Sequence, residues 1–242
     1  MKNVVWMLIF VVPVILFAQD EAEEKIWTTQ LGVSYVNTSG NTETETFSGK
    51  LDVEGAGWGN RYILGSSYVF AQTADVESAN KFDSEARAER ILTGRLFAFL
   101  GATYLMDKYA GYDSRISIGP GLGVDLINNE KRTLKGMLSS MYYFDEYAIP
   151  DQESENYATG KAGLTYTCQI KEHVSWKALG DYLVSLDETD RYFITGDLSL
   201  QVGINSYLAV GLGYQINYQN APPDPAIKKT DTTFLSSVVV NW

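Results

Sequence analysis

The feature that most constrains this chain is an alternation of apolar and polar residues with a period of two. From Arg115 to Leu126, large apolar side chains alternate with small or charged ones, and 174–186 and 207–218 repeat the pattern. Successive side chains of a β-strand point to opposite faces, so such a strand lies between two different environments. No stretch after the first residues has a convincing helical period. The sequence therefore predicts an all-β fold.

About twelve such segments follow one another along the chain. They lie near residues 26–38, 42–54, 61–71, 82–92, 95–106, 113–126, 133–145, 156–169, 174–186, 191–202, 207–218 and 232–242. Most of them are about 11 to 14 residues long, which suits tilted strands that cross a bilayer, because about 9–11 residues span the apolar zone.

The connections between these segments differ in length on the two sides. Those after even-numbered segments are short, whereas those after odd-numbered ones include Gln72–Lys81, Glu146–Glu155 and Gln219–Asp231, which are long and acidic or proline-rich. Tight turns on one side and long loops on the other are typical of outer-membrane barrels. The sequence predicts one domain, residues 26–242, folded as a transmembrane antiparallel up-and-down β-barrel of about twelve strands.

The first residues have the pattern of a secretory leader. Lys2 precedes a short apolar run that ends at Phe17, and Ala18-Gln19 is a plausible cleavage point, which predicts a signal peptide over 1–18. Residues 19–25 form an acidic lead. The formal net charge is −11 for the whole chain, and the acidic excess argues against nucleic acid as a partner. We expect the protein in the cell outer membrane.

Four tryptophans outside the leader lie at strand ends or turns on the short-turn side: Trp27, Trp58, Trp176 and Trp242. Aromatic side chains with a polar edge prefer the boundary between hydrocarbon and headgroups, so we expect these four at a membrane interface. The last strand also resembles the C-terminal aromatic signal of bacterial barrels, which the barrel-assembly machinery reads during insertion. Expected partners are therefore this machinery, outer-membrane lipids and lipopolysaccharide.

Two segments of the sequence resemble segments of a known protein family. "YVNTSGNTETET", from Tyr35 to Thr46, and "GYDSRISIGPGLGVDLI", from Gly111 to Ile127, resemble segments of the salt-induced outer-membrane protein family, a domain of unknown function. The resemblance implies a barrel fold and an outer-membrane location, and the family name suggests a link to salt stress. It implies no substrate.

Charged residues on the face opposite the apolar stripe are the candidate lumen lining. They comprise eight basic and six acidic residues: Lys50, Asp52, Glu85, Arg87, Glu89, Arg95, Arg115, Asp125, Lys135, Lys161, Lys177, Asp181, Arg191 and Asp197. At bilayer depth they must face water or one another. Two interpretations stay open, a narrow charge-lined pore and a packed network of salt bridges. Arg115, beside small neighbours, is expected to reach Asp181 or Asp197.

Other chemistry has weaker support in the sequence. Gly119, Gly121 and Gly123 alternate within a strand, which favours space for neighbouring groups over a phosphate-binding loop. Pro120 among them predicts a local bulge. His173 falls in a turn, and Cys168 falls on the lipid-facing side of its strand. We therefore expect no catalytic residue.

The acids of the long loops show no Ca²⁺-binding spacing, so neither a metal site nor a cofactor is predicted. The function favoured is a non-enzymatic barrel, either a narrow channel for small solutes or a structural envelope protein. The alternatives are a membrane-embedded barrel hydrolase and a secreted soluble barrel that binds a ligand inside.

Overall fold

The computed structural model describes residues 26–38 and 44–241. The predicted signal peptide, the acidic lead and Trp242 lie outside these residues. In the described part of the chain, no helix has the length and apolar character that a membrane span requires.

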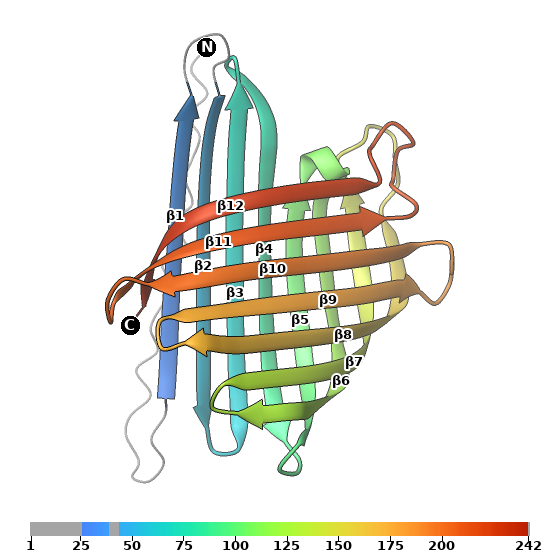
Figure 1. Ribbon diagram of the computed structural model, residues 1–242. Coiled ribbons are helices and arrows are strands. Elements are labelled where there is room, and N and C mark those ends of the chain that lie inside the picture. Colours follow the sequence, from blue (N-terminus) through green and yellow to red (C-terminus); the bar gives the residue numbers. More distant parts are fainter. Residues whose placement is uncertain (1–25, 39–43, 242) are drawn as a thin grey trace, which may run out of the picture.

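Twelve antiparallel strands close into one barrel, which confirms the predicted architecture (Figure 1). The strands are β1 (Ile26–Thr38), β2 (Thr44–Gly57), β3 (Asn60–Thr73), β4 (Val76–Ile91), β5 (Leu96–Asp107), β6 (Tyr112–Asn129), β7 (Arg132–Tyr147), β8 (Glu155–Lys171), β9 (Val174–Ser185), β10 (Tyr192–Gly203), β11 (Leu208–Gln219) and β12 (Thr230–Asn241). A short 3-10 helix, Lys108–Ala110, joins β5 to β6. The sheet closes where β1 pairs with β12, from Gln30 opposite Asn241 to Val33 opposite Val238.

The apolar stripe of each strand lies on the outside of the barrel. Leu138 on β7 is 67% exposed, and Leu122, Leu164 and Leu198 on other strands are also exposed. A soluble barrel would turn this stripe inward, whereas an outward apolar face is what a lipid environment favours. The secreted soluble alternative therefore disagrees with the direction in which these side chains point.

The connections follow the predicted asymmetry with one exception. The end that carries the β2–β3, β4–β5, β6–β7, β8–β9 and β10–β11 connections is called the turn end here, and the opposite end is called the loop end. The exception is Gln72–Lys81, predicted as a long loop at the loop end. Strands β3 and β4 continue through it to a two-residue turn at Ala74 and Asp75, whose φ angles are 49° and 61°.

Two consecutive positive φ angles suit the right-handed twist of a hairpin, so the turn needs no further residues. The acids at 75 and 77 suggested a loop, but they are compatible with a solvated strand end. In Figure 1 the β3–β4 hairpin rises beyond the barrel wall beside β5 and β6. At the loop end, long connections remain between β7 and β8 and between β11 and β12.

The glycines of β6 make room for neighbouring groups rather than for a phosphate. A Cβ atom at Gly121 would overlap the Phe99 ring, and one at Gly123 would overlap the Phe97 ring. Both rings belong to β5, directly opposite. The bulge predicted at Pro120 is absent, because the β6–β7 register is the same on both sides of it and shifts only nearer the strand ends.

Candidate functional site in the barrel lumen

The inward faces of the strands form two regions that differ in packing. We call the region over β3 to β9 that is filled by ion pairs and aromatic rings the packed sector; its main charged members are Arg61, Glu89, Arg115, Asp125 and Asp145. We call the region over β9 to β12, β1 and β2 the polar sector; its central charged members are Lys50, Asp52, Lys177 and Asp197, with Glu54 and Asp231 nearer its two ends.

At the turn end, the packed sector is held by Arg61 of β3. Its guanidinium lies 2.6 Å from the Glu89 carboxylate on β4 and donates to Asp125 Oδ2 on β6 at 3.1 Å. It also stacks on the Phe97 ring, 4.5 Å from the centroid. The Glu89 side chain is completely buried. Because β4 and β5 lie between β3 and β6, Arg61 crosses the lumen and closes part of it.

Arg61 was not among the predicted lumen residues. It stands at the start of its strand beside a turn, where an arginine is easily interpreted as solvated. Its place in the alternation of the strand indicates that it faces inward, since it alternates with Tyr62 and shares a face with Ile63 and Gly65. Lys135, a predicted lumen residue on β7 opposite Asp125, lies within electrostatic range of this cluster.

At the loop end, Arg115 forms a two-point ion pair with Asp145. Arg115 Nε donates to Oδ1 at 2.9 Å and Nη2 donates to Oδ2 at 2.6 Å, and the Asp145 side chain is 0% exposed. The Tyr157 hydroxyl also donates to Asp145 Oδ2, at 2.9 Å. This pair therefore has the geometry and the extra hydrogen bond that a buried charge requires.

The expectation that Arg115 reaches Asp181 or Asp197 is wrong. Asp145 stands directly opposite Arg115 on the neighbouring strand β7, so no reach across the lumen is needed to find a carboxylate. Asp181 pairs with Lys161 instead, at 2.7 Å.

Aromatic rings enclose the Arg115 guanidinium. Its central carbon lies 3.8 Å from the Tyr112 ring centroid and 4.6 Å from that of Phe193, which comes from β10. The Tyr112 hydroxyl donates to Gln219 Oε1 on β11 at 3.2 Å. These contacts join β6 to strands four and five positions away in the barrel, so at the loop end side chains bridge the packed sector to β10 and β11 of the polar sector.

The loops at this end pack against the same corner. Gly111, with φ of 90°, precedes β6, and a Cβ atom there would meet Pro223 and Ile227 of the β11–β12 loop and Ile149 of the β7–β8 loop. Only glycine fits both this backbone conformation and this approach. The two longest loops therefore meet over the packed sector.

Arg191 and Arg95 were predicted on the inward face of strands. Arg191 instead ends the β9–β10 loop, where it pairs with Glu155 at 2.5 Å and with Glu188 at 3.1 Å. Burial lowers the pKa of Arg191, but the hydrogen bond and charge of Glu155 outweigh this and raise the pKa above its ordinary value. Arg95 lies exposed in the β4–β5 turn, where its carbonyl accepts a hydrogen bond from the Asp125 N–H at 2.8 Å. Both arginines continue the alternation of a strand beyond the end of that strand. The alternation alone does not show where the strand ends.

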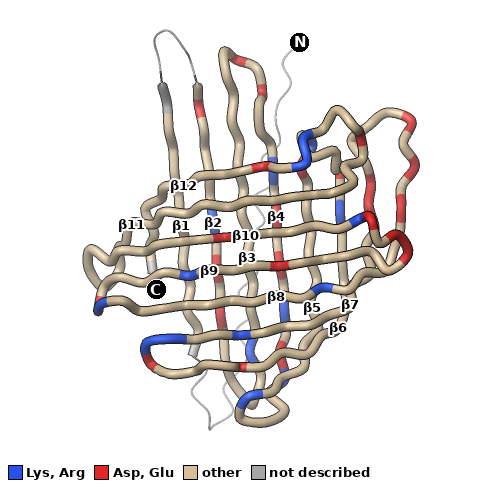
Figure 2. Tube along the Cα trace, turned by 45° about the vertical axis from the view of Figure 1, so that its right-hand side comes forward, with Lys and Arg blue, Asp and Glu red and all other residues tan. Residues whose placement is uncertain are grey.

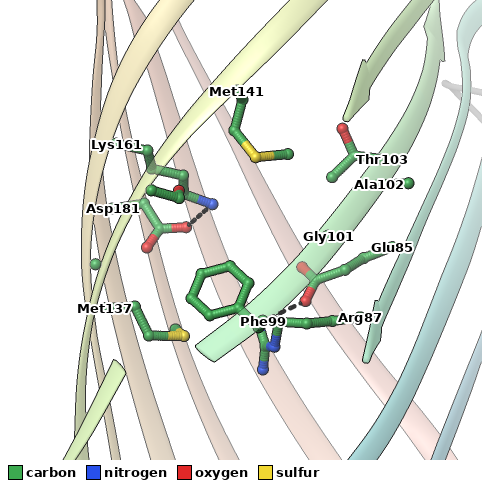
Figure 3. A pocket seen from close by; sticks show the side chains of 12 residues that line it. Glu85, Arg87, Phe99, Gly101, Ala102, Thr103, Met137, Met141, Lys161 and Asp181 are labelled. Atoms are coloured by element: carbon green, nitrogen blue, oxygen red, sulfur yellow. Dashed lines mark hydrogen bonds and ion pairs between the residues drawn. The ribbon is translucent and has the colours of Figure 1, made fainter. Parts of the chain in front are cut away.

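A small cavity lies in the middle of the packed sector, between two ion pairs (Figure 3). On one side Arg87 pairs with Glu85 at 2.9 Å, and on the other Lys161 pairs with Asp181. The cavity measures about 40 Å³ and is also lined by Phe99, Met137 and Met141. This volume holds a few water molecules and no larger solute.

The polar sector has the opposite character. Lys50, in the middle of β2, lies 3.3 Å from Asp52, and the two side chains are 57% and 36% exposed. Lys177 on β9 is exposed, and Asp197 on β10 lies within electrostatic range of Lys50, Lys177 and Asp52. These side chains belong to inward faces, so their exposure means that open space adjoins them inside the barrel.

Charge is also distributed unevenly between the two ends. Figure 2 shows acidic residues gathered on loops at the loop end, whereas Lys and Arg are prominent at the turns of the other end. In the described part of the chain, no group of His, Cys, Asp and Glu has an arrangement that holds a metal ion.

Residues singled out for other roles have ordinary surroundings. His173 is exposed in the β8–β9 turn. Cys168 faces outward, opposite Trp176. Trp27 and Trp58 are exposed at the turn end, and Trp176 packs edge-on against Tyr166 with the ring centroids 5.3 Å apart.

Comparison with known proteins places the chain in a family. The family model described as "Protein of unknown function, DUF481" matches residues 31–242. The chain belongs to this family. It is 23% identical over 201 residues to the uncharacterized protein YdiY of Escherichia coli (strain K12), across 83% of this chain and 77% of that protein. The family description carries no mention of salt, so salt induction stays a prediction.

Solved structures with a similar fold are outer-membrane barrels. The chain aligns with the NanC porin with a TM-score of 0.51 and 8% identity, over 88% of this chain and 97% of that one. It also aligns with the translocator domain of the autotransporter NalP from Neisseria meningitidis, with a TM-score of 0.48 and 12% identity, over 90% and 87%. At 8% identity the likeness to the NanC porin concerns the fold alone: the barrel is like those of outer-membrane porins.

Proposed function

We propose that this protein is a non-enzymatic outer-membrane barrel whose polar sector forms a narrow, water-filled passage for small solutes. The observation that carries the proposal is the exposure of Lys50. A lysine ammonium is kept at the middle of a membrane-spanning strand only where water or a counter-charge reaches it. More than half of the Lys50 side chain is exposed on the inward face, so water is available there.

The packed sector is the reason for proposing that the passage is narrow. Bridges from Arg61 to Asp125, from Arg115 to Phe193 and from Tyr112 to Gln219 remove part of the cross-section. Barrels of sixteen to eighteen strands leave a wide aqueous channel, whereas about eight strands are filled by side chains. A twelve-stranded barrel with one filled sector fits an intermediate, size-limited passage.

Location, orientation and partners belong to the same proposal. The outward apolar face suits outer-membrane lipids, and the acidic loop end suits contact with lipopolysaccharide through shared cations if it faces the cell exterior. Insertion by the barrel-assembly machinery would follow from the aromatic terminal strand. A role in salt stress remains part of the proposal on the strength of the family resemblance alone.

The test is single-channel recording in a planar bilayer. Wild-type protein is expected to give discrete current steps, and Lys50→Trp, which fills the passage, is expected to reduce them. Leu51→Trp is the matched control, because the next residue of the same strand faces outward and should leave the step size unchanged. A barrel that inserts and conducts nothing would favour the structural envelope role instead.

A further inference from the structure

The polar sector brings charges of both signs together on two walls of the lumen. Lys50 and Asp52 come from β2, whereas Lys177 comes from β9 and Asp197 from β10. Asp197 is the diagonal neighbour of Lys177 across the β9–β10 ladder, on the same face, and it is within electrostatic range of Lys50 and Asp52. The four groups therefore form one cluster although β11, β12 and β1 lie between β10 and β2. Two ammonium groups and two carboxylates give this cluster no net charge.

The four groups are available to a solute. The Lys50–Asp52 pair is solvent-exposed at 3.3 Å, and an exposed pair of this kind is weak enough to exchange its partner. Within the described residues, Lys177 and Asp197 form no ion pair with one another or with a neighbour. In contrast, Glu85 and Asp181 of the packed sector are held by Arg87 and Lys161.

The rest of this wall is mainly polar. Amides and hydroxyls continue the inward face across β10, β11, β12 and β1, interrupted on β12 by Leu235 and Val239: Ser199, Gln215, Asn217, Thr233 and Gln30. Glu54, further along β2 toward the turn end, lies within electrostatic range of Lys135. The passage therefore offers hydrogen bonds along its length and balanced charges at one level.

A ring of charges of one sign favours ions of the opposite sign. A balanced cluster has no such preference, but its potential changes sign over a few ångströms. A solute that carries an ammonium and a carboxylate a short distance apart matches both signs at once, whereas a simple anion or cation meets attraction and repulsion together.

Building on the proposed passage, we infer that it selects small zwitterionic solutes of amino-acid size. Lys50 and Lys177 would receive the carboxylate of the solute, and Asp52 and Asp197 would receive its ammonium group. The amide and hydroxyl side chains of the wall would contact the remainder of the solute without selecting for a particular solute side chain.

Liposome swelling tests this inference with two isomers. Glycine is a zwitterion, and glycolamide has the same atoms without formal charge, so size is matched. We expect glycine to enter proteoliposomes about threefold faster than glycolamide, the scale of one or two exposed charge contacts. Glycolate and ethanolamine, which carry one charge each, are expected to enter more slowly than glycine.

Variants show whether the cluster is responsible. Neutralising it with Lys50→Gln, Asp52→Asn, Lys177→Gln and Asp197→Asn should make the glycine and glycolamide rates equal. Arg95→Gln removes a charge from an exposed turn and should preserve the difference. Exchanging the signs with Lys50→Asp and Asp52→Lys keeps the cluster balanced and should retain the preference for glycine. This variant tests the inference even when the neutral variant does not fold.

The outcomes separate this inference from the proposed function. If glycolamide enters and glycine enters no faster, the passage exists and zwitterion selection is wrong. If neither isomer enters liposomes that contain heat-modifiable, folded barrel, both the passage and the inference are wrong. A strong preference for either K⁺ or Cl⁻ in a salt gradient across a planar bilayer would also overturn the balanced cluster.

Discussion

The two sectors of the lumen are built by the same kind of strand and yet have different interiors. In the packed sector, glycines on β6 receive the Phe97 and Phe99 rings, and each buried carboxylate faces an arginine or lysine. In the polar sector, many inward positions carry hydroxyl and amide side chains, and Lys50 and Lys177 remain exposed. A packed network in one sector is therefore compatible with the proposed passage in the other.

Size and pairing of the side chains account for this difference. A strand wall can fill the lumen only when large side chains meet small ones on the next strand, as Phe97 does with Gly123. Where both neighbours are small, as with Ser199 opposite Gly213, the side chains leave space that is large enough for water to enter.

The largest effect is expected from Arg115→Ala in the packed sector. It leaves the fully buried Asp145 carboxylate with only the Tyr157 hydroxyl, which should lower the free energy of unfolding by about 3–5 kcal/mol. The measurement is the unfolding midpoint in urea, followed by gel mobility without boiling. Channel current should change little in molecules that remain folded. A normal midpoint with altered current would place Arg115 in the passage and make the division into sectors wrong.

A smaller effect is expected when a glycine of β6 gains a methyl group. In Gly123→Ala the new Cβ would overlap the Phe97 ring, which should destabilise the barrel by about 1–3 kcal/mol. Gly49→Ala on β2 is the matched control, because a Cβ there meets no atom within 4 Å. Equal unfolding midpoints for the two variants would mean that the Phe97 ring is not packed on β6.

The smallest effect on stability is expected in the polar sector. Lys50→Ala removes one exposed partner of Asp52 and should change the free energy of unfolding by less than about 1 kcal/mol. The same change should alter the size of the current steps, because the side chain borders the passage. A destabilisation comparable with that of Arg115→Ala would show that Lys50 is buried and that the polar sector is filled.

The period-two pattern was sufficient to predict the twelve strands and the direction of their apolar face, because alternation is a local property of the chain. The pattern could not give the partner of Arg115. Register decides that partner, and register depends on turn geometry and on bulges such as the one between Tyr112 and Ser114. From the sequence alone, Asp181 and Asp197 were equally good candidates for the partner of Arg115.

Strand ends were predicted least well, for a related reason. Arg95 and Arg191 continue the inward phase but lie one residue before β5 and β10 begin, and Gln72–Lys81 was interpreted as a loop although a two-residue turn lies within it. Polar residues are compatible with both a loop and a solvated strand end. The hydrogen-bonded partner across the hairpin distinguishes the two, and a single sequence does not show that partner.

The most direct test of the divided lumen is block of single-channel current by a charged, water-soluble thiol reagent. In a Cys168→Ser background, Lys50→Cys places a thiol in the polar sector, and Ser117→Cys places one at a fully buried inward position of the packed sector. We predict that the reagent lowers the current through Lys50→Cys channels and leaves Ser117→Cys channels unchanged. Equal block at both positions, or no current from the folded parent barrel, would contradict the account.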